Sequence, residues 1–467
     1  MNSTIEQQTI ISHVASAACT PLTLIDSIAG SGKTTLLVAI ANALPHTNGL
    51  YLAYNNSVAK EATHKFPSTT HCMTTHALAY RATVKQFKLA LGTFTYKSIQ
   101  EPVKYEIKCE IVDYIRSFCL SKYLTFAEFA LELDLPTYYV PIATKYLDLM
   151  QNGRIECTHD FYLKLFHILL ATNQITYDPF DFIMLDEAGD LNEVTLAIFQ
   201  LLPTSKRIAV GDKHQNIYQF NNTINCFSVL DGQGTTFRLT QSFRVASHIA
   251  TRIESFCRSY LDPDMQFKGV QLTDTSIHTR AFLTRTNSTL IAKMIQLNRE
   301  GISYGLVRDP KEIFKFPLML CNLSYQGFIS DPSYKFLQAD IDDWYETDHL
   351  REIYPTLFGY IASLCSEDDQ LTKAISLIGQ YGKAKILDAY EEARKHRKSS
   401  QSFILATAHS TKGLEFDEVT IADDLNECMK PIVPDPALLS SQQREIVNLY
   451  YVACSRAAKQ LNNALYL

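Results

Sequence analysis

The first ninety residues alternate short apolar runs with runs in which apolar residues recur every three or four positions. Consecutive apolar residues predict buried strands, and the longer spacing predicts amphipathic helices. The predicted strands cover 22–25 and 50–54, and the predicted helices cover 33–43 and 57–65. Strands that alternate with helices in this way form βαβ units, so the pattern indicates a parallel sheet.

The pattern changes between residues 88 and 170, where helix-period stretches such as 112–118 dominate. Strand patterns return at 182–185 and 207–210, and an aspartate follows each of them within two residues. We therefore expect a helical segment inserted into the first α/β region.

A second α/β region is predicted to begin near residue 240. Its strands are expected at 281–283, 403–405 and 419–421. An irregular stretch rich in tyrosine and aspartate, from about 305 to 398, is expected to interrupt it and contains Trp344.

The length and composition fit a soluble protein of several domains. A chain of 467 residues suggests two to four domains. Its 46% hydrophobic and 20% charged residues are ordinary for globular proteins. No apolar run approaches the roughly 18 residues that cross a bilayer. Residues 1–6 have neither the basic region nor the apolar stretch of a signal peptide.

Charge and cysteine usage narrow the class of protein further. A net charge of −6 argues against a uniformly basic surface but permits a local basic groove with stacking aromatic rings. The basic run 394–398 is interpreted as a solvated linker. The eleven cysteines show no Cys-x-x-Cys pair and no zinc spacing. Reduced thiols are expected, which indicates the cytoplasm, or the nucleus in a eukaryote.

Residues 26–35, Asp-Ser-Ile-Ala-Gly-Ser-Gly-Lys-Thr-Thr, form a nucleotide-binding P-loop between an apolar run and an amphipathic run. Glycines in such a loop let backbone N–H groups surround phosphate oxygens at a helix N-terminus. Lys33 is expected to reach the β- and γ-phosphates, and Thr34 to offer its hydroxyl to Mg²⁺. Ser27 stands where the consensus has glycine. The alternative is a glycine-rich turn, but the Gly-Lys-Thr context favours binding of a nucleoside triphosphate.

Asp186 and Glu187 follow the apolar run 182–185 directly. The carboxyl end of a strand in an open α/β sheet faces the phosphate crevice. One carboxylate there can hold Mg²⁺, and the other can orient or deprotonate the attacking water. The alternative, a solvated acidic pair, is less favoured because a P-loop lies upstream.

Further motifs extend the pattern over most of the chain. In order, the nine motifs are Glu6–Gln8, the P-loop, Tyr54–Ala59, Thr74–Tyr80, Asp186–Asp190, Gly211–Phe220, Gln241–Arg244, Thr407–Phe416 and Tyr451–Ala457. This ordered set resembles superfamily 1 helicases of the Rep, UvrD and PcrA type. Residues 50–55 and 448–453 are most similar to the F-box DNA helicase branch. No F-box is recognised, so the resemblance covers the motor alone, over residues 6–459.

The resemblance implies an α/β fold with two RecA-like P-loop domains, parallel sheets, an inserted subdomain in each, and ATP in the cleft between them. The expected domains are 1A at 1–87 and 171–239 with the helical insertion 1B at 88–170, and 2A at 240–304 and 399–467 with a 2B-like insertion at 305–398.

The resemblance also implies roles for single residues at the nucleotide. Arg244 and Arg456 would stabilise charge on the transferring phosphoryl group. Gln7 and Phe243 would contact adenine, and Glu415 would face the ribose. The expected catalytic residues are Lys33, Asp186, Glu187, Gln215, Arg244 and Arg456. The expected nucleotide-binding residues are Gln7, Ala29, Gly30, Ser31, Gly32, Lys33, Thr34, Thr35, Phe243 and Glu415. Thr34 and Asp186 are the expected Mg²⁺ ligands.

Contacts to DNA are implied for eight residues: Tyr54, Asn55, Thr75, His76, Tyr218, Phe220, Thr407 and His409. Aromatic rings stack on bases, and hydroxyls and imidazoles contact phosphates. The alternative is that His76 and His409 are buried structural histidines and that Phe220 belongs to the core. Gly189 departs from the family, which usually has glutamine there, and its missing amide is predicted to affect coupling.

The implied function is that of an ATP-dependent DNA helicase that uses Mg²⁺, moves 3′→5′ on single-stranded DNA and unwinds duplex junctions in replication, recombination or repair. No membrane is expected as a partner, and the sequence indicates no protein partner. One alternative is a non-motor P-loop protein, such as a regulatory switch or a small-molecule kinase. Another is a DNA-binding remodeller with weak turnover, suggested by Gly189. DNA-stimulated ATPase activity distinguishes the motor from the non-motor protein.

Overall fold

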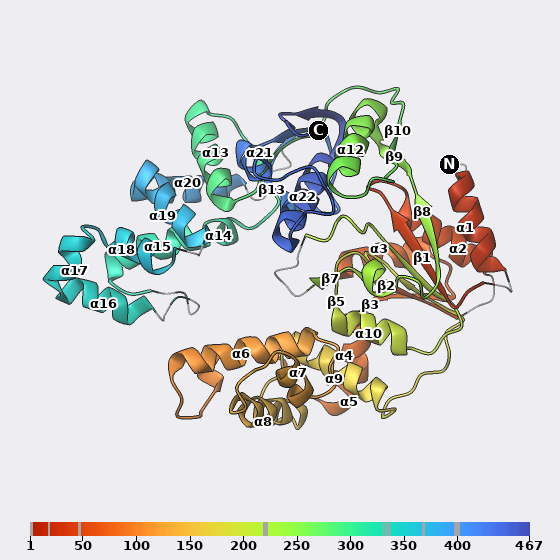
Figure 1. Cartoon of the computed structure of the whole chain (residues 1–467), viewed down its shortest axis with the longest axis horizontal. Coiled ribbons are helices and arrows are strands. Elements are labelled where there is room, and N and C mark those ends of the chain that lie inside the picture. The colour runs from red at the N-terminus through yellow and green to blue at the C-terminus, as the bar shows by residue number, and fades with distance from the viewer. Residues whose placement is uncertain are drawn as a thin grey trace. The chain divides into compact units, whose positions relative to one another are not determined.

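The computed structural model describes residues 3–16, 19–44, 48–217, 223–329, 331, 334, 337–366, 369–396 and 402–467. It divides into two compact units, unit 1 over residues 1–244 and unit 2 over residues 245–467 (Figure 1). Each unit contains a parallel sheet flanked by helices. The predicted α/β fold class is confirmed, whereas the bounds of the six predicted domain segments stay predictions.

Unit 1 is built on a six-stranded sheet in the order β3-β2-β4-β6-β1-β8, and its neighbouring strands are parallel. The strands are β1 (Leu22–Ser27), β2 (Gly49–Ala53), β3 (Thr70–Thr74), β4 (Phe182–Leu185), β6 (Arg207–Gly211) and β8 (Thr235–Leu239). The four strands predicted in this region are confirmed. The polar sequence of the edge strand β3 gave no apolar run to detect.

Alternate residues of these strands point to opposite faces of the sheet. Leu50 and Leu52 of β2 join one apolar core, and Tyr51 joins the other. The helices packed around the sheet are α1 (Ile5–Ala15), α2 (Lys33–Ala43), α3 (Asn56–Lys65), α4 (Thr75–Ala82), α10 (Glu193–Leu201) and α11 (Cys226–Val229), with the two-stranded ribbon of β5 (Leu191–Asn192) and β7 (Thr223–Ile224). β9 (Gln241–Ala246) carries the chain toward unit 2.

A helical segment follows α4 in unit 1. It contains α5 (Val84–Phe87), η1 (Tyr96–Ser98), α6 (Tyr105–Leu120), α7 (Phe126–Glu132), α8 (Tyr139–Gln151) and α9 (His159–Ala171). Figure 1 shows α4 and α10 between the sheet and these helices. The apolar core of the segment is continuous with one face of the sheet. The predicted helical character of residues 88–170 is therefore confirmed.

Unit 2 contains a five-stranded parallel sheet in the order β12-β13-β11-β14-β15. Its strands are β11 (Arg280–Thr284), β12 (Gly305–Leu306), β13 (Phe403–Thr407), β14 (Phe416–Ile421) and β15 (Ala457–Asn462), and β10 (Lys268–Val270) lies outside this sheet. The three predicted strands are confirmed. The helices around the sheet are α12 (Ser247–Tyr260), α13 (Asn287–Glu300), η4 (Ala408–Thr411), α21 (Asp423–Met429) and α22 (Ser441–Cys454).

The prediction that residues 305–398 are irregular is wrong. The segment contains α14 (Pro310–Ile313), α15 (Lys315–Gln326), α16 (Gln338–Glu346), α17 (Asp348–Ile353), α18 (Leu357–Leu364), α19 (Asp369–Tyr381) and α20 (Lys383–His396). Apolar residues recur at helical spacing, as in α19, where Leu371, Ala374 and Ile378 are buried. Residues 394–396 end α20, and residues 397–398 lie outside the described residues.

In the described part of the chain, each helix is too short or too polar to cross a membrane.

Candidate nucleotide and nucleic-acid sites

The P-loop joins β1 to α2 through two glycines in left-handed conformations. Gly30 has φ +72° and Gly32 has φ +78°, a region that other residues enter at a cost. A Cβ atom on Gly30 would lie 2.6 Å from the Cβ of Arg244 and 2.8 Å from the Oγ of Ser242. The backbone therefore passes too close to β9 for any side chain at position 30.

Ser27, the departure from the P-loop consensus, has a structural partner. Its Oγ donates a hydrogen bond of 2.8 Å to the carbonyl oxygen of Gly211, and Ser27 is buried. The serine thus ties the start of the P-loop to the end of β6, where the loop that carries Gln215 begins.

The two predicted catalytic carboxylates lie beside the P-loop lysine. Lys33 Nζ is 3.8 Å from Glu187 Oε1. Asp186 is 5% exposed, and its Oδ1 accepts the backbone N–H of Glu187 at 2.9 Å. Glu187 has φ +53°, an uncommon left-handed conformation for a residue with a side chain. The turn after β4 therefore brings both carboxylates near Lys33 of the P-loop.

Burial has the largest effect on the pKa of Asp186 and raises it above the ordinary value. The charge of Glu187 raises this pKa further, whereas the hydrogen bond from Tyr51 and the charge of Lys33 lower it. A hydroxyl and carboxylates are the hard oxygen donors that suit Mg²⁺. Within the described residues no group of three or more His, Cys, Asp or Glu forms a metal site. Thr34 and Asp186 offer such donors, and their role as Mg²⁺ ligands stays a prediction. At nucleotide sites Mg²⁺ usually takes its other ligands from phosphates and water.

The loop after β6 is organised by Asp212, to which the sequence assigned no role. Its carboxylate accepts the backbone N–H of His214 at 3.0 Å and the Nε2 of Gln215 at 2.8 Å. Gln215 is 4% exposed, so its amide has a fixed direction. The sequence pattern marked Asp212 as an aspartate that follows a strand, without assigning it a role.

Gly189 lies in a place without room for a side chain. A Cβ atom there would lie 2.2 Å from the carbonyl oxygen of Asp212. A Cβ atom on Gly211 would lie 2.7 Å from the backbone nitrogen of Gly189, and the N–H of Ala188 donates to Val210 at 2.9 Å. The loops after β4 and β6 thus touch through their backbones, where a glutamine at 189 does not fit.

Helix α1 and β9 meet the P-loop on its other side. The Gln7 amide accepts the backbone N–H of Thr4 at 3.1 Å and donates to the carbonyl oxygen of Ser31 at 3.4 Å. A Cβ atom on Gly32 would lie 3.6 Å from the ring of Phe243. Gln7, the P-loop, Phe243 and Arg244 are therefore brought together within unit 1, although the sequence placed residues 240–304 with the second half. Their roles at adenine and phosphate stay predictions.

Unit 2 holds Arg456 and Glu415. Arg456 is 2% exposed and lies between α22 and β15. Its guanidinium donates to the carbonyl oxygen of Val452 at 2.9 Å, to that of Leu414 at 3.4 Å and to the Oγ of Ser455 at 3.0 Å. Glu415 is exposed. Acceptors of unit 2 therefore fix the direction of the Arg456 side chain.

Four predicted DNA-contacting residues of unit 1 follow the adjacent strands β2 and β3. Tyr54 is 49% exposed, and Asn55 caps α3 by accepting the N–H of Val58 at 2.9 Å. Thr75 is buried as the first residue of α4, and His76 is half-buried on the same helix. The structure brings these four residues to one edge of the sheet, and their contact with DNA stays a prediction.

His76 lines a hollow of about 370 Å³ between α4 and α9. The other lining residues are Asn56, Thr74, Ala77, Tyr80, Arg81, Lys85, His159 and Tyr162. Burial lowers the pKa of His76, and the nearby charge of Asp160 opposes this effect. Among the described residues, no carboxylate lies within ion-pair distance of Arg81 or Lys85. These two cations were missed because helical position alone does not show that they share a hollow.

In unit 2 the predicted residue Thr407 ends β13, and His409 follows it. Arg285 follows β11 and Arg308 follows β12, so all four lie at the carboxyl ends of neighbouring strands. Burial first, and then the charges of Arg285 and Arg308, lower the pKa of His409 to about 4. Thr407 is buried and donates to the Oγ of Ser410 at 3.2 Å.

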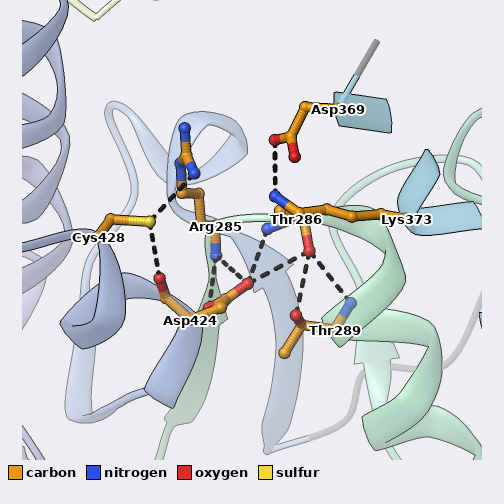
Figure 2. Close-up of polar contacts among 7 residues, drawn as sticks. All are labelled: Arg285, Thr286, Thr289, Asp369, Lys373, Asp424 and Cys428. Carbon is orange, nitrogen blue, oxygen red and sulfur yellow. Dashed lines mark hydrogen bonds and ion pairs between the residues drawn. The ribbon is translucent and has the colours of Figure 1, made fainter. Parts of the chain in front are cut away.

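Figure 2 shows how the end of β11 is held. The carboxylate of Asp424 accepts the backbone N–H groups of Arg285 and Thr286 at about 3.0 Å, and the Arg285 guanidinium donates to the Sγ of Cys428 at 3.0 Å. The sequence rule that identified Asp186 would also have identified Arg285, because both follow an apolar strand.

The predicted DNA contacts Tyr218 and Phe220 lie outside the described residues.

Comparisons with known proteins match part of each unit to a known family. Residues 8–221 match the AAA domain family, and residues 347–465 match the UvrD-like helicase C-terminal domain family. The chain is 24% identical to F-box DNA helicase protein 1 of Schizosaccharomyces pombe over 94% of this chain and 55% of the relative. It is 26% identical to F-box DNA helicase 1 of Gallus gallus over 98% of this chain and 48% of the relative. The chain thus spans about half the length of these curated relatives.

Proposed function

We propose that this chain, which belongs to the UvrD-like superfamily 1 helicases and is related to their F-box DNA helicase branch, uses ATP to move along single-stranded DNA and to unwind duplexes. The observation that supports the proposal most directly is the set of side chains around the P-loop of unit 1. Lys33, Asp186 and Gln215 come from three loops that follow β1, β4 and β6, which are neighbours in the sheet.

Each of these residues would have its own role in ATP hydrolysis, set by the chemistry of its side chain. Lys33 binds the β- and γ-phosphates, and Gln215, directed by Asp212, orients the attacking water. Glu187 accepts a proton from that water. Thr34 and Asp186 would hold Mg²⁺, which neutralises phosphate charge when bound.

Two arginines would stabilise the charge that develops on the transferring phosphoryl group. Arg244 belongs to unit 1, where its Cβ lies beside Gly30 of the P-loop. Arg456 belongs to unit 2 and must reach the phosphate from there. ATP binding would then draw the units toward each other and hydrolysis would release them, so that their DNA-contacting edges grip the strand in alternation.

The family supports the finer parts of the proposal. These are 3′→5′ translocation, action at junctions of single-stranded and duplex DNA, and work in replication, recombination or repair. The cytoplasm, or the nucleus of a eukaryotic cell, is the corresponding location.

The test compares ATPase activity with and without single-stranded DNA and measures unwinding of forks with either a 3′ or a 5′ tail. We expect stimulation of hydrolysis by the strand and unwinding from the 3′ tail alone, with Lys33→Ala inactive in both assays. An equal rate of ATP hydrolysis with and without DNA would contradict the proposed motor and favour a P-loop switch or kinase.

A further inference from the structure

We propose that Tyr51 is a positioning residue of the nucleotide site, whose hydroxyl holds the Asp186 carboxylate in the orientation that a Mg²⁺ ion requires. This inference rests on the proposed ATP hydrolysis. It adds a residue to which neither the motif pattern nor the family matches assign a role.

The contact joins two neighbouring strands. β2 pairs in parallel with β4, with Tyr51 opposite Met184, and the N–H of Asp186 donates to the carbonyl oxygen of Leu52 at 3.1 Å. The Tyr51 hydroxyl donates to Oδ2 of Asp186 at 2.6 Å. Both side chains are buried, so water does not compete strongly for this bond.

The Tyr51 ring has a fixed position. It has no exposed surface, belongs to the core beneath α1, α2 and α3, and lies 4.6 Å from the ring of Phe66 between centroids. A ring held in this way directs its hydroxyl to one point. Tyr51 therefore acts on Asp186 as a rigid support.

The carboxylate of Asp186 is held at both oxygens. Oδ2 accepts the Tyr51 hydroxyl, and Oδ1 accepts the N–H of Glu187 at 2.9 Å. Each carboxylate oxygen has two acceptor positions, so one position on each oxygen remains for a metal ion or its bound water. Partners of metal ligands that fix their orientation commonly change metal affinity or activity about 10–100-fold when removed.

Phenylalanine at position 51 would fill the same space and lose just the hydroxyl. We expect Tyr51→Phe to retain the fold, to raise the Mg²⁺ concentration for half-maximal binding of a fluorescent ATP analogue by about 10-fold, and to lower kcat similarly. Binding of the analogue in EDTA should be unchanged, because the P-loop itself is intact.

Tyr146→Phe is the matched control. Tyr146 is also buried in unit 1 and donates to a carboxylate, that of Glu101, but it lies in the helical segment away from the P-loop. Tyr146→Phe removes the same kind of bond, together with the hydrogen bond of 2.6 Å that the Tyr146 hydroxyl accepts from the N–H of Gln100. It should leave the Mg²⁺ dependence of nucleotide binding unchanged. A double variant with Asp186→Asn completes the test, because Tyr51→Phe should then have no further effect on that dependence.

Unchanged Mg²⁺ half-saturation and unchanged kcat in folded Tyr51→Phe would overturn the proposal. If that variant does not fold, Phe66→Leu can be used instead, because it loosens the packing of the Tyr51 ring. It should raise the Mg²⁺ concentration for half-saturation about 2- to 5-fold, a smaller change because the Tyr51 hydroxyl is still present. No change in Phe66→Leu would likewise overturn it. Absence of ATP hydrolysis in the unaltered protein would reject the proposed function itself, whereas a normal Tyr51→Phe in an active protein rejects the role of Tyr51 alone.

Discussion

The two units hold their predicted catalytic side chains in different ways. In unit 1 these side chains bond to one another, as Lys33 does to Glu187 and Gln215 does to Asp212. In unit 2 Arg456 is held mostly by backbone carbonyl groups. The paired side chains of unit 1 form one connected site, whereas Arg456, one of the cations of unit 2, is directed by uncharged acceptors. Damage to unit 1 should affect nucleotide binding, and damage to unit 2 should affect turnover.

Lys33→Ala should have the largest effect, because it removes the cation of the connected site. We expect hydrolysis to fall below detection, while binding of single-stranded DNA, measured by fluorescence anisotropy, persists. Lys65→Ala, which removes an exposed ion pair with Glu61 in the same unit, is the control and should hydrolyse ATP normally. DNA-stimulated hydrolysis in Lys33→Ala would reject the P-loop assignment.

Arg456→Ala tests the other side of the comparison. Turnover should drop about 10³-fold or more, as for other arginine fingers, with a much smaller change in nucleotide affinity. Arg456→Lys should also fail, because an ammonium group cannot reproduce the planar guanidinium. Arg252→Ala is the control for the loss of carbonyl bonds, since Arg252 donates to Ala464 at 3.1 Å in the same unit. Near-normal turnover of Arg456→Ala with DNA present would contradict the two-unit mechanism.

Gly189→Gln tests whether the connected site tolerates glutamine, the residue that is usual in the family at this position. The close approach to Asp212 predicts overpacking that costs about 1–3 kcal/mol, with lower ATPase activity and a lower midpoint of thermal unfolding. Gly379→Ala in α19 is the control, since a Cβ atom there meets nothing within 4 Å. Improved unwinding per ATP in Gly189→Gln would show instead that the missing amide limits coupling.

Changing Arg81 and Lys85 together to alanine separates strand binding from hydrolysis within unit 1. We expect a several-fold loss of affinity for single-stranded DNA, with basal ATPase activity retained. The slope of log affinity against log salt should fall by about 0.7 for each DNA phosphate that the variant no longer neutralises. Lys97→Ala, an exposed change outside the hollow, should leave the slope unchanged. An unaltered slope in the double variant would mean that the hollow binds no phosphate.

The smallest effect concerns stability against acid. In the helical segment, burial and then the charge of Lys164 lower the pKa of His167 to about 4. Between pH 6.5 and pH 4 the unfolded chain therefore binds a proton that the folded chain does not, and stability falls as the pH falls. The loss should be about 1 kcal/mol near pH 5.5, and His167→Phe should reduce it in urea unfolding curves. An equal loss of stability in both proteins would mean that titratable groups other than His167 cause it.

Local signals explain what the sequence predicted well. Apolar runs marked the central strands, and the Gly-Lys-Thr sequence marked the turn that places Lys33. Long-range neighbours explain what it missed. Tyr51 meets Asp186 because β2 and β4 pair, although 135 residues separate them. The helices between residues 305 and 398 were missed because tyrosines and aspartates obscure their apolar spacing.

Strand β2 has a consequence for communication between ligands. Its Tyr51 touches the nucleotide side of the sheet through Asp186, and Asn55 stands four residues further along at the predicted DNA edge. Strand β2 ends at Ala53, and the chain bends at Tyr54 and Asn55 before α3 begins. If binding of the metal–nucleotide complex raises the affinity for DNA, thermodynamic linkage requires DNA to raise the affinity for that complex by the same factor. Residues 51–55 of unit 1 thus join the predicted metal ligand Asp186 and the predicted DNA contact Asn55 within one short segment of the chain.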